Sequence, residues 1–229
     1  MPNFNIVKKS EYKKTFRNES IKGQFDLDIN SIKEEFNGNI DIEDKKWNVG
    51  LIVGSSGSGK STIAKQVFGE NYINELKYGG ESIIDEMPKN KSTEEITKTF
   101  NSVGFATVWS WLKPYHVLSN GEKMRVDLAK SILSDKELIV FDEFTSVVDR
   151  TIAKTSSSAI QKAIRKKDKK FVAVACHYDI IDWLEPDWIY DTDKQEFFFA
   201  QKNTKDQKLN LKSDNVKQKI GTDLKSIII

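Results

Sequence analysis

The sequence predicts an α/β fold in which helices flank a mainly parallel core sheet. Apolar runs typical of buried strands, at 49–53, 138–141 and 171–176, alternate with helix-forming stretches. A chain of 229 residues is long enough for one such domain with its own core. A glycine-rich loop follows the first of these runs and precedes a helix-forming stretch, which is the setting of a phosphate-binding loop.

Composition narrows the class of protein. With 38% hydrophobic and 31% charged residues, the chain resembles soluble globular domains, and no run approaches the roughly twenty apolar residues of a membrane span. No N-terminal signal pattern follows Met1, and the single cysteine, Cys176, excludes an internal disulfide. We therefore expect a cytoplasmic protein.

Charge is distributed unevenly along the chain. The net charge is +2, but residues 1–22 and 201–229 each carry +4, which leaves −6 for the rest. Basic ends add salt-dependent affinity for nucleic acid, and the alternative is that they are solvated tails that aid solubility. Residues 201–229 are polar, rich in lysine and lack aromatic residues, so we expect a disordered tail there.

The residues before the loop predict a small antiparallel β layer. Apolar residues recur in short runs at 4–7, 25–29 and 39–42, and in the latter two they alternate with polar ones. Tyr12 and Phe16 lie between basic residues, so either ring could stack on an adenine base. Packing in the core is the alternative for both rings.

The glycine-rich loop fits the pattern G-x-x-x-x-G-K-[ST] in full, and its residues are Gly54, Ser55, Ser56, Gly57, Ser58, Gly59, Lys60, Ser61 and Thr62. The glycines allow backbone angles closed to other residues, so successive N–H groups can face phosphate oxygens. Lys60 supplies a positive charge to the β and γ phosphates, and the Ser61 hydroxyl is a ligand for Mg²⁺. The loop predicts binding of a nucleoside triphosphate with Mg²⁺.

A short strand is expected at 81–88, ended by Pro88. Its last residues include Asp85 and Glu86, and a strand end in a parallel sheet is where ligands bind. One of these carboxylates would approach the Mg²⁺ ion or its water, and a surface role is the alternative.

A helical subdomain is expected at about 89–135, with one helix at 92–100. The aromatic residues at 104–118 favour core packing over binding of a partner. Ser119 and Glu122 have the spacing of a capping box, which predicts the start of a further helix.

Two strand ends carry the remaining candidate catalytic residues. The strand at 138–141 leads to Asp142, which would hold the Mg²⁺ shell through water, and to Glu143, which would orient and deprotonate an attacking water. The strand at 171–176 leads to His177, from where a side chain reaches the γ-phosphate. A purely structural histidine is the alternative.

Taken in order, these motifs resemble those of the ATP-binding-cassette (ABC) ATPases. The resemblance covers about residues 45–185 and rests on five features: the loop 54–62, the signature-like Leu118-Ser119-Asn120-Gly121-Glu122, the acidic strand end Asp142-Glu143, the loop 146–149 and His177. It implies a P-loop NTPase fold of ABC type in a domain at 1–200, with a small N-terminal β layer and a reduced helical subdomain.

The resemblance also implies the role of each residue. Lys60, Ser61 and Thr62 would bind ATP and Mg²⁺ with support from Asp142. Glu143 would be the catalytic base and His177 the γ-phosphate sensor. Two chains would pair head to tail in an ATP-dependent homodimer. Ser119 and Gly121, with Glu122 of the same signature, would contact the γ-phosphate bound to the other subunit, and Asp149 would bridge the two active sites.

Two departures from the family pattern disfavour a transporter subunit. The signature has Asn120 where a glycine is usual and Glu122 where transporters commonly have glutamine. The interval from Lys60 to Ser119 is short and lacks an obvious glutamine at a strand end, a place that Asp85 would take. The runs 141–150 and 176–179 look closer to small soluble ABC ATPases of phages and prokaryotes, some fused to an acetyltransferase-like domain.

The sequence therefore favours a soluble, Mg²⁺-dependent ATP hydrolase of ABC type, in the host cytoplasm if the chain is phage-encoded. Its ATP-driven dimerisation would act on DNA, RNA or a protein bound to nucleic acid, as the basic ends suggest. The alternatives are the nucleotide-binding subunit of an ABC transporter and a P-loop phosphotransferase.

Overall fold

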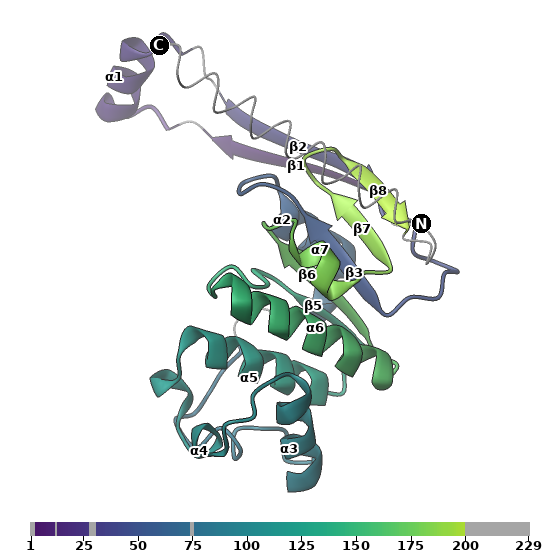
Figure 1. Cartoon of the computed structure of the whole chain (residues 1–229). Helices are drawn as coiled ribbons and strands as arrows, with labels where there is room; N and C mark the ends of the chain where they lie inside the picture. Colours follow the sequence, from purple (N-terminus) through teal and green to yellow (C-terminus); the bar gives the residue numbers. More distant parts are fainter. Residues whose placement is uncertain (1–2, 12, 28–30, 74–75, 200–229) are drawn as a thin grey trace. The chain divides into compact units, whose positions relative to one another are not determined.

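The computed structural model describes residues 3–11, 13–27, 31–73 and 76–199. The predicted tail at 201–229 and the predicted adenine-stacking residue Tyr12 lie outside these ranges. The described residues up to 198 belong to one compact unit, in which Figure 1 shows a helix-flanked sheet and a separate two-stranded ribbon. Among the described residues, none of the helices has both the length and the apolar composition for crossing a bilayer.

Within the described ranges, the main sheet has six strands in the order β4-β5-β6-β3-β7-β8. Strand β3 pairs in parallel with β6 and β7, and β5 pairs in parallel with β4 and β6. The carboxyl ends of these strands therefore lie along one edge of the sheet, and the predicted α/β class is confirmed. The strands are β3 (Val49–Val53), β4 (Tyr72–Ile73), β5 (Leu138–Phe141), β6 (Lys170–Ala175), β7 (Trp188–Asp191) and β8 (Glu196–Phe199).

The central strand β3 forms the middle of the core. All five of its residues are buried, as an apolar run between two parallel neighbours should be. Gly50 allows Trp188 of β7 to pack directly on the backbone, because a Cβ at this position would lie 2.1 Å from the Trp188 ring. Trp47 and Phe68 also pack against the Trp188 ring, with ring centroids 5.5 and 6.2 Å away.

The helices fall into two groups. Helices α2 and α6 both contact the central strands β3 and β6, and α7 packs on α6. Helices α3 and α5 contact each other and α6, and Figure 1 shows them together with α4. The bounds are α2 (Lys60–Phe68), α3 (Thr93–Ser102), α4 (Val108–Trp111), α5 (Asn120–Leu133), α6 (Arg150–Lys166) and α7 (Ile180–Leu184), with short 3-10 turns η1 (Gly69–Asn71) and η2 (Tyr115–Val117).

The N-terminal residues form an antiparallel ribbon of β1 (Asn3–Glu11) and β2 (Ser31–Asn39). The strand predicted at 25–29 is wrong for residues 25–27, because helix α1 (Phe16–Gln24) ends just before them and Phe25 is its C-cap; residues 28 and 29 lie outside the described ranges. Thr15 begins α1 by accepting a hydrogen bond from the Asn18 N–H at 3.3 Å. The strand predicted at 39–42 is also wrong, since β2 ends at Asn39.

The strand predicted at 81–88 is wrong as well. These residues form a turn with an isolated bridge between Ser82 and Pro114. The N–H groups of Ile83 and Ile84 donate to the carbonyls of Lys113 and Trp111 at 3.0 and 3.1 Å. The segment is therefore attached to the residues between α4 and η2, and the outer neighbour of β5 in the sheet is β4.

Candidate nucleotide-binding site

The predicted phosphate-binding loop connects the carboxyl end of β3 to the start of α2. Gly57 and Gly59 have φ angles of 83° and 85°, in the left-handed region that favours glycine. Gly59 is the N-cap of α2 and supplies no side-chain cap, so the first N–H groups of the helix are left for another acceptor. This arrangement suits an anion such as a phosphate group.

Lys60 begins α2, and its Nζ donates a hydrogen bond to the Ser55 carbonyl at 2.6 Å. The ammonium group therefore lies over the loop, where the β and γ phosphates are expected. The loop has the donors that a triphosphate needs: a lysine and uncapped helix N–H groups.

An aromatic ring of the ribbon covers one side of the loop. The ring of Phe36, on β2, lies so close to Gly59 that a Cβ there would be 2.2 Å from its Cε1 atom. Phe36 is half-buried. By contrast, the sequence-predicted candidate Phe16 is 90% exposed on α1. Sequence reasoning missed Phe36 because nothing near it in the chain marks a nucleotide site.

Two of the residues predicted to hold Mg²⁺, Ser61 and Asp142, both interact with Tyr72 of β4. The Tyr72 hydroxyl donates to the Asp142 carboxylate and is also within reach of the Ser61 hydroxyl. Burial, followed by the hydrogen bond to Asp142, raises the pKa of Tyr72, so this residue remains a neutral donor. The other Asp142 oxygen accepts the Glu143 N–H at 2.8 Å.

Ser61 and Asp142 fit the predicted metal. No cluster of three or more His, Cys, Asp or Glu side chains that could hold a metal occurs within residues 3–11, 13–27, 31–73 and 76–199. Mg²⁺ in nucleotide sites needs none, because it binds one or two protein groups and completes its shell with phosphate oxygens and water. The Ser61 hydroxyl and the Asp142 carboxylate, which both interact with the Tyr72 hydroxyl, supply that pair.

Glu143 lies at the end of β5 in a strained turn. Its φ angle is 51°, which is uncommon for a residue with a side chain. The buried Phe144 anchors the turn, since its N–H donates to the Val174 carbonyl of β6 at 2.8 Å. The Glu143 side chain is consequently exposed at the nucleotide edge of the sheet.

His177 follows β6, the strand between β5 and β3. Its side chain is exposed. The parallel register places Ala175 beside Val53, so the residues after β6 lie next to the start of the phosphate-binding loop. The fold thus brings His177, Glu143 and the loop to the same edge of the sheet.

The signature-like residues begin α5 with the predicted capping box. The Glu122 N–H donates to Ser119 Oγ at 3.3 Å, and the Ser119 N–H donates to Glu122 Oε2 at 3.0 Å. The Ser110 hydroxyl donates to Glu122 Oε1 at 2.6 Å, and this hydrogen bond is the main cause that lowers the Glu122 pKa. Asn120 is the first residue of the helix, so it needs no left-handed backbone.

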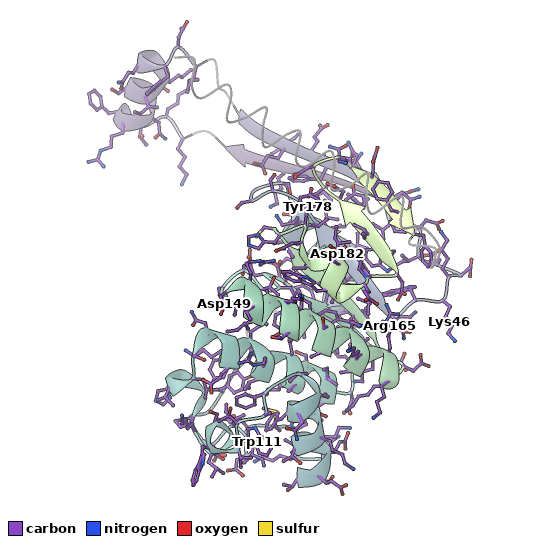
Figure 2. The ribbon with its side chains drawn as sticks, in the orientation of Figure 1. Lys46, Trp111, Asp149, Arg165, Tyr178 and Asp182 are labelled. Carbon is purple, nitrogen blue, oxygen red and sulfur yellow. The ribbon has the colours of Figure 1, made fainter. Side chains whose placement is uncertain are left out.

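The exposure of these residues differs. Ser119 and Asn120 are exposed, whereas Gly121 is buried against α6, where a Cβ would lie 2.9 Å from Ile152 Cδ1. Asp149 caps α6 by accepting the N–H groups of Thr151 and Ile152 at 2.8 and 3.0 Å, and it lies at the start of that helix in Figure 2.

Asp85 does not join the other predicted metal ligands. It lies in the turn at 82–86, where its carboxylate accepts the Ser82 hydroxyl. The same turn is hydrogen-bonded to residues 111–114, before η2. The metal role of Asp85 remains a prediction without support from this geometry.

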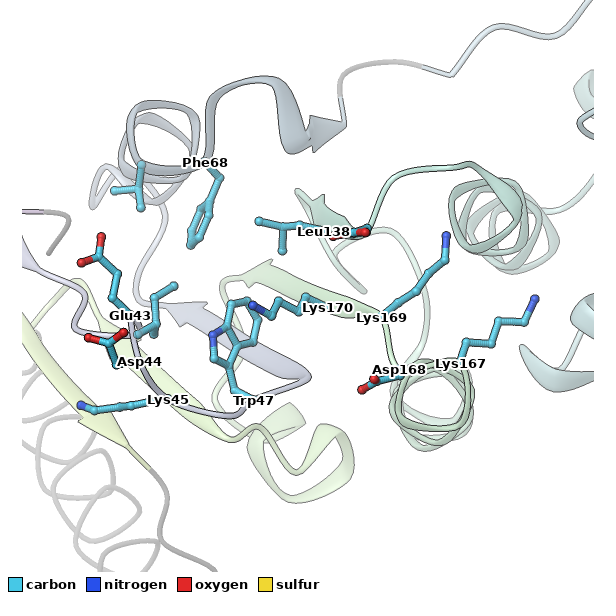
Figure 3. A pocket seen from close by; sticks show the side chains of 13 residues that line it. Glu43, Asp44, Lys45, Trp47, Phe68, Leu138, Lys167, Asp168, Lys169 and Lys170 are labelled. Atoms are coloured by element: carbon cyan, nitrogen blue, oxygen red, sulfur yellow. The ribbon is translucent and has the colours of Figure 1, made fainter.

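A pocket of about 900 Å³ lies elsewhere in the molecule (Figure 3). Its lining includes residues that precede β3, the first residue of β5 and residues at the start of β6, among them Trp47, Leu138 and Lys170. These are the amino ends of parallel strands, so the pocket lies opposite the nucleotide edge. The Lys170 ammonium already lies 5.1 Å from the Trp47 ring centroid.

Comparison with known proteins supports the family predicted from the motifs. No protein-family model matches the chain. The chain is 29% identical over 178 residues to the energy-coupling factor transporter ATP-binding protein EcfA1 of Mycoplasmopsis synoviae, covering 62% of this chain and 67% of that protein. It is 24% identical to the oligopeptide transport ATP-binding protein OppD of Lactococcus lactis subsp. cremoris, covering 59% and 55%.

Solved structures give the same result for the fold. The cbiO1 protein of Clostridium perfringens, part of the ABC transporter complex cbiONQ, matches with a TM-score of 0.57 at 16% identity and covers 84% of this chain and 91% of that one. The dimeric ABC transporter cassette MJ0796 matches with a TM-score of 0.54 at 15% identity and covers 81% and 94%.

The chain spans only part of each relative, 67% of the length of EcfA1 and 55% of the length of OppD. Both of these relatives are described as ATP-binding proteins of transport systems, and the subgroup of small phage and prokaryotic ATPases stays a prediction. The chain has the fold of an ABC cassette, and homologues and structures together support its place among the ABC-type ATPases.

Proposed function

We propose that the chain binds Mg²⁺ and ATP at the carboxyl edge of its sheet and hydrolyses the ATP. The observation that carries this proposal is that one edge holds the loop with Lys60, the pair Ser61 and Asp142, and the side chains of Glu143 and His177. Phosphoryl transfer depends mainly on positioning and charge stabilisation, and this set supplies both.

Each residue at this edge has a different role in the proposed hydrolysis of ATP. Glu143 accepts a proton from a water molecule whose oxygen bonds to the γ-phosphorus. The bond to the bridging β-phosphate oxygen then breaks, which releases ADP and phosphate. Lys60 and the loop N–H groups hold the phosphate charges, while His177 contacts the γ-phosphate. Ser61 and Asp142 would hold Mg²⁺, which would supply positive charge to the phosphate oxygens.

The adenine ring is proposed to stack on Phe36. This ring is half-buried and lies against Gly59, and aromatic stacking tolerates any base. The reassignment replaces Phe16, whose side chain is 90% exposed on α1.

The test of hydrolysis compares two glutamates at opposite ends of β5. Glu143→Gln removes the proposed base at the nucleotide edge, and Glu137→Gln changes the residue just before β5 at the opposite edge. We expect Glu143→Gln to lower ATP turnover about 100-fold or more with little loss of ATP affinity, and Glu137→Gln to leave both unchanged. Undiminished hydrolysis by Glu143→Gln would remove the proposed base.

We further propose that two copies close around two ATP molecules. Ser119 and Asn120 are exposed at the start of α5, where they are available to the triphosphate of a second copy. The matched cassette MJ0796 is described as dimeric. Light scattering of Glu143→Gln with and without ATP measures this directly. We expect the mass to double with ATP, and a constant monomer mass would contradict the dimer.

For the partner, the comparisons favour the transporter alternative over the nucleic-acid hypothesis. The relatives described above are transport ATP-binding proteins. The segment before the signature also exposes a set of apolar side chains, which is typical of interaction surfaces: Val108, Trp109, Leu112 and Val117, with exposed fractions of 57%, 78%, 60% and 55%. We propose that a membrane-embedded subunit docks on this apolar segment.

The partner test has two arms. If the proposal holds, the chain co-purifies with a membrane protein from a membrane fraction, and Trp109→Ser with Leu112→Ser abolishes this while ATP binding persists. The second arm titrates DNA and RNA at two salt concentrations. Binding that weakens steeply with salt would instead support the nucleic-acid hypothesis.

The phosphotransferase alternative is tested by product analysis. The relatives described above are transport ATP-binding proteins and none is described as a kinase. With γ-labelled ATP and cell extract, we expect the label to appear only in free phosphate. Label in another acceptor would favour phosphotransfer.

A further inference from the structure

The turn between β7 and β8 lies against the phosphate-binding loop. Asp193 accepts two hydrogen bonds from Ser55, one from the N–H at 2.8 Å and one from the hydroxyl at 2.7 Å. Hydrogen bonds to a carboxylate are stronger than those between neutral groups. Asp193 therefore holds the first part of the loop, and the Ser55 donors point to protein and not to a ligand.

A second contact joins the same turn to the loop. The hydroxyls of Thr192 and Ser58 lie 2.6 Å apart, and the Thr192 N–H donates to the Val53 carbonyl at 2.8 Å. A Cβ at Gly54 would lie 2.0 Å from Thr192 Oγ1, so glycine is needed for this close approach. The turn thus contacts the loop at its first, second and fifth residues.

Tyr178 connects this turn to the segment that follows β6, which contains His177. Its hydroxyl lies 3.0 Å from Asp191 Oδ1 and 3.1 Å from Asp193 Oδ2, and it donates to these carboxylates. Burial and then the two carboxylates raise the pKa of Tyr178, so the hydroxyl stays protonated. Tyr178 directly follows His177, and it is labelled in Figure 2.

Asp191 holds both the Tyr178 hydroxyl and the backbone of the turn. It is fully buried at the end of β7, and its Oδ1 also accepts the N–H groups of Asp193 and Lys194 at 3.0 and 3.2 Å. These two bonds set the shape of the turn. The Tyr178 hydroxyl is therefore held by two carboxylates whose own positions are fixed by the backbone.

We propose that Asp193 and Tyr178 are positioning residues that couple the phosphate-binding loop to His177. Asp193 binds the N–H and hydroxyl of Ser55, and the N–H groups later in the loop remain free to bind phosphate. Because Tyr178 follows His177 directly, its hydrogen bond to Asp193 also restrains the backbone of His177. The geometry of the loop and the placement of the γ-phosphate sensor are consequently set together. This inference rests on the ATPase function proposed above.

The two residues are expected to affect ATP affinity and turnover to different extents. Asp193→Asn replaces one acceptor with a donor that faces Ser55 and weakens the hydrogen bond from Tyr178, so we expect ATP affinity to fall about tenfold and turnover to fall about threefold. Tyr178→Phe keeps the ring and removes only the hydroxyl, so we expect turnover to fall about tenfold with a change in ATP affinity of less than about threefold. Asp193→Glu keeps the charge and should restore part of the affinity.

The double variant tests the coupling itself. Because the two residues share a hydrogen bond, the effects of Tyr178→Phe and Asp193→Asn on turnover should be less than multiplicative. Tyr190→Phe is the matched control, since its hydroxyl reaches only the Asn37 carbonyl, at 3.4 Å, in the described part of the chain. ATP affinity is measured by calorimetry, turnover by phosphate release, and folding by thermal unfolding.

The outcomes are distinct. If either variant unfolds, Ser55→Ala removes only the hydroxyl bond to Asp193, and it should lower ATP affinity about threefold in a folded protein. Folded variants that bind and hydrolyse ATP within twofold of the wild type would overturn the proposal, as would fully multiplicative effects. A wild-type protein that binds no ATP would instead contradict the proposed ATPase function.

Discussion

Two regions of this protein differ in what holds them in place. Strand β3 and the loop that follows it lie at the centre of the sheet, and all five residues of β3 are buried. Helix α1 of the N-terminal ribbon has a proper N-cap at Thr15, yet none of its nine residues is buried. A helix this short is marginal in water by itself, because most helical stability in proteins comes from packing.

The comparison shows that a local capping signal determines where a helix begins, whereas burial determines how much the element stabilises the fold. The cap is sufficient to set where α1 begins, but it contributes little to the stability of the whole fold. In β3, burial against parallel neighbours fixes the position of the phosphate-binding loop, so that loop geometry depends on the core. Phe36 of the ribbon contacts the loop at Gly59.

The largest difference between the two regions is expected when a positively charged side chain is removed from each. Lys60→Ala should weaken ATP binding about 100-fold, because removing one partner of a desolvated charge pair costs ~2 kcal/mol or more. Arg17→Ala removes a cation from α1 and should leave ATP affinity unchanged. Isothermal titration measures both variants. An equal effect of the two would show that the ribbon helix belongs to the nucleotide site.

Core packing should give the next largest effect. Leu51→Ala in β3 removes a fully buried side chain and should lower the free energy of unfolding by about 3 kcal/mol. Leu27→Ala, after α1, changes a side chain that is 40% exposed and should cost less than about 0.5 kcal/mol. Denaturant unfolding compares them, and similar costs would mean that the ribbon has a core of its own.

The contact between the regions should give a smaller effect. Phe36→Ala should weaken ATP binding about tenfold, since stacking of a base on an aromatic ring contributes roughly 1–3 kcal/mol. Phe25→Ala removes a ring that is 62% exposed and should have no effect on affinity. Fluorescence titration with a labelled ATP analogue distinguishes them. Unchanged affinity in Phe36→Ala would exclude the adenine assignment.

The smallest effect is expected for the caps. Thr15→Ala should speed hydrogen exchange in α1 without a measurable change in Tm, because α1 buries nothing. Ser119→Ala breaks the capping box of α5, eight of whose residues are buried, and should lower the free energy of unfolding by about 1 kcal/mol. A Tm shift for Thr15→Ala as large as that for Ser119→Ala would mean that α1 is part of the cooperative fold.

The sequence by itself determined the features that depend on short stretches of neighbouring residues. The loop at 54–62, the buried strands that lead to Asp142 and His177, and the capping box at Ser119 each depend on a short pattern with a local physical cause. The order of the chain was also enough to predict the α/β class and the ABC family, which the comparisons support.

Only the tertiary structure decided which residues from distant parts of the chain meet. Phe36 packs against Gly59, and the pairing of β4 with β5 brings Tyr72 to Asp142. No local pattern encodes either contact. The same is true of Asp193, which is 138 residues from Ser55 in sequence. Residues 81–88 failed as a strand because the backbone of 111–114 offered hydrogen bonds that the sheet did not, and such competition is settled only when the whole chain is folded.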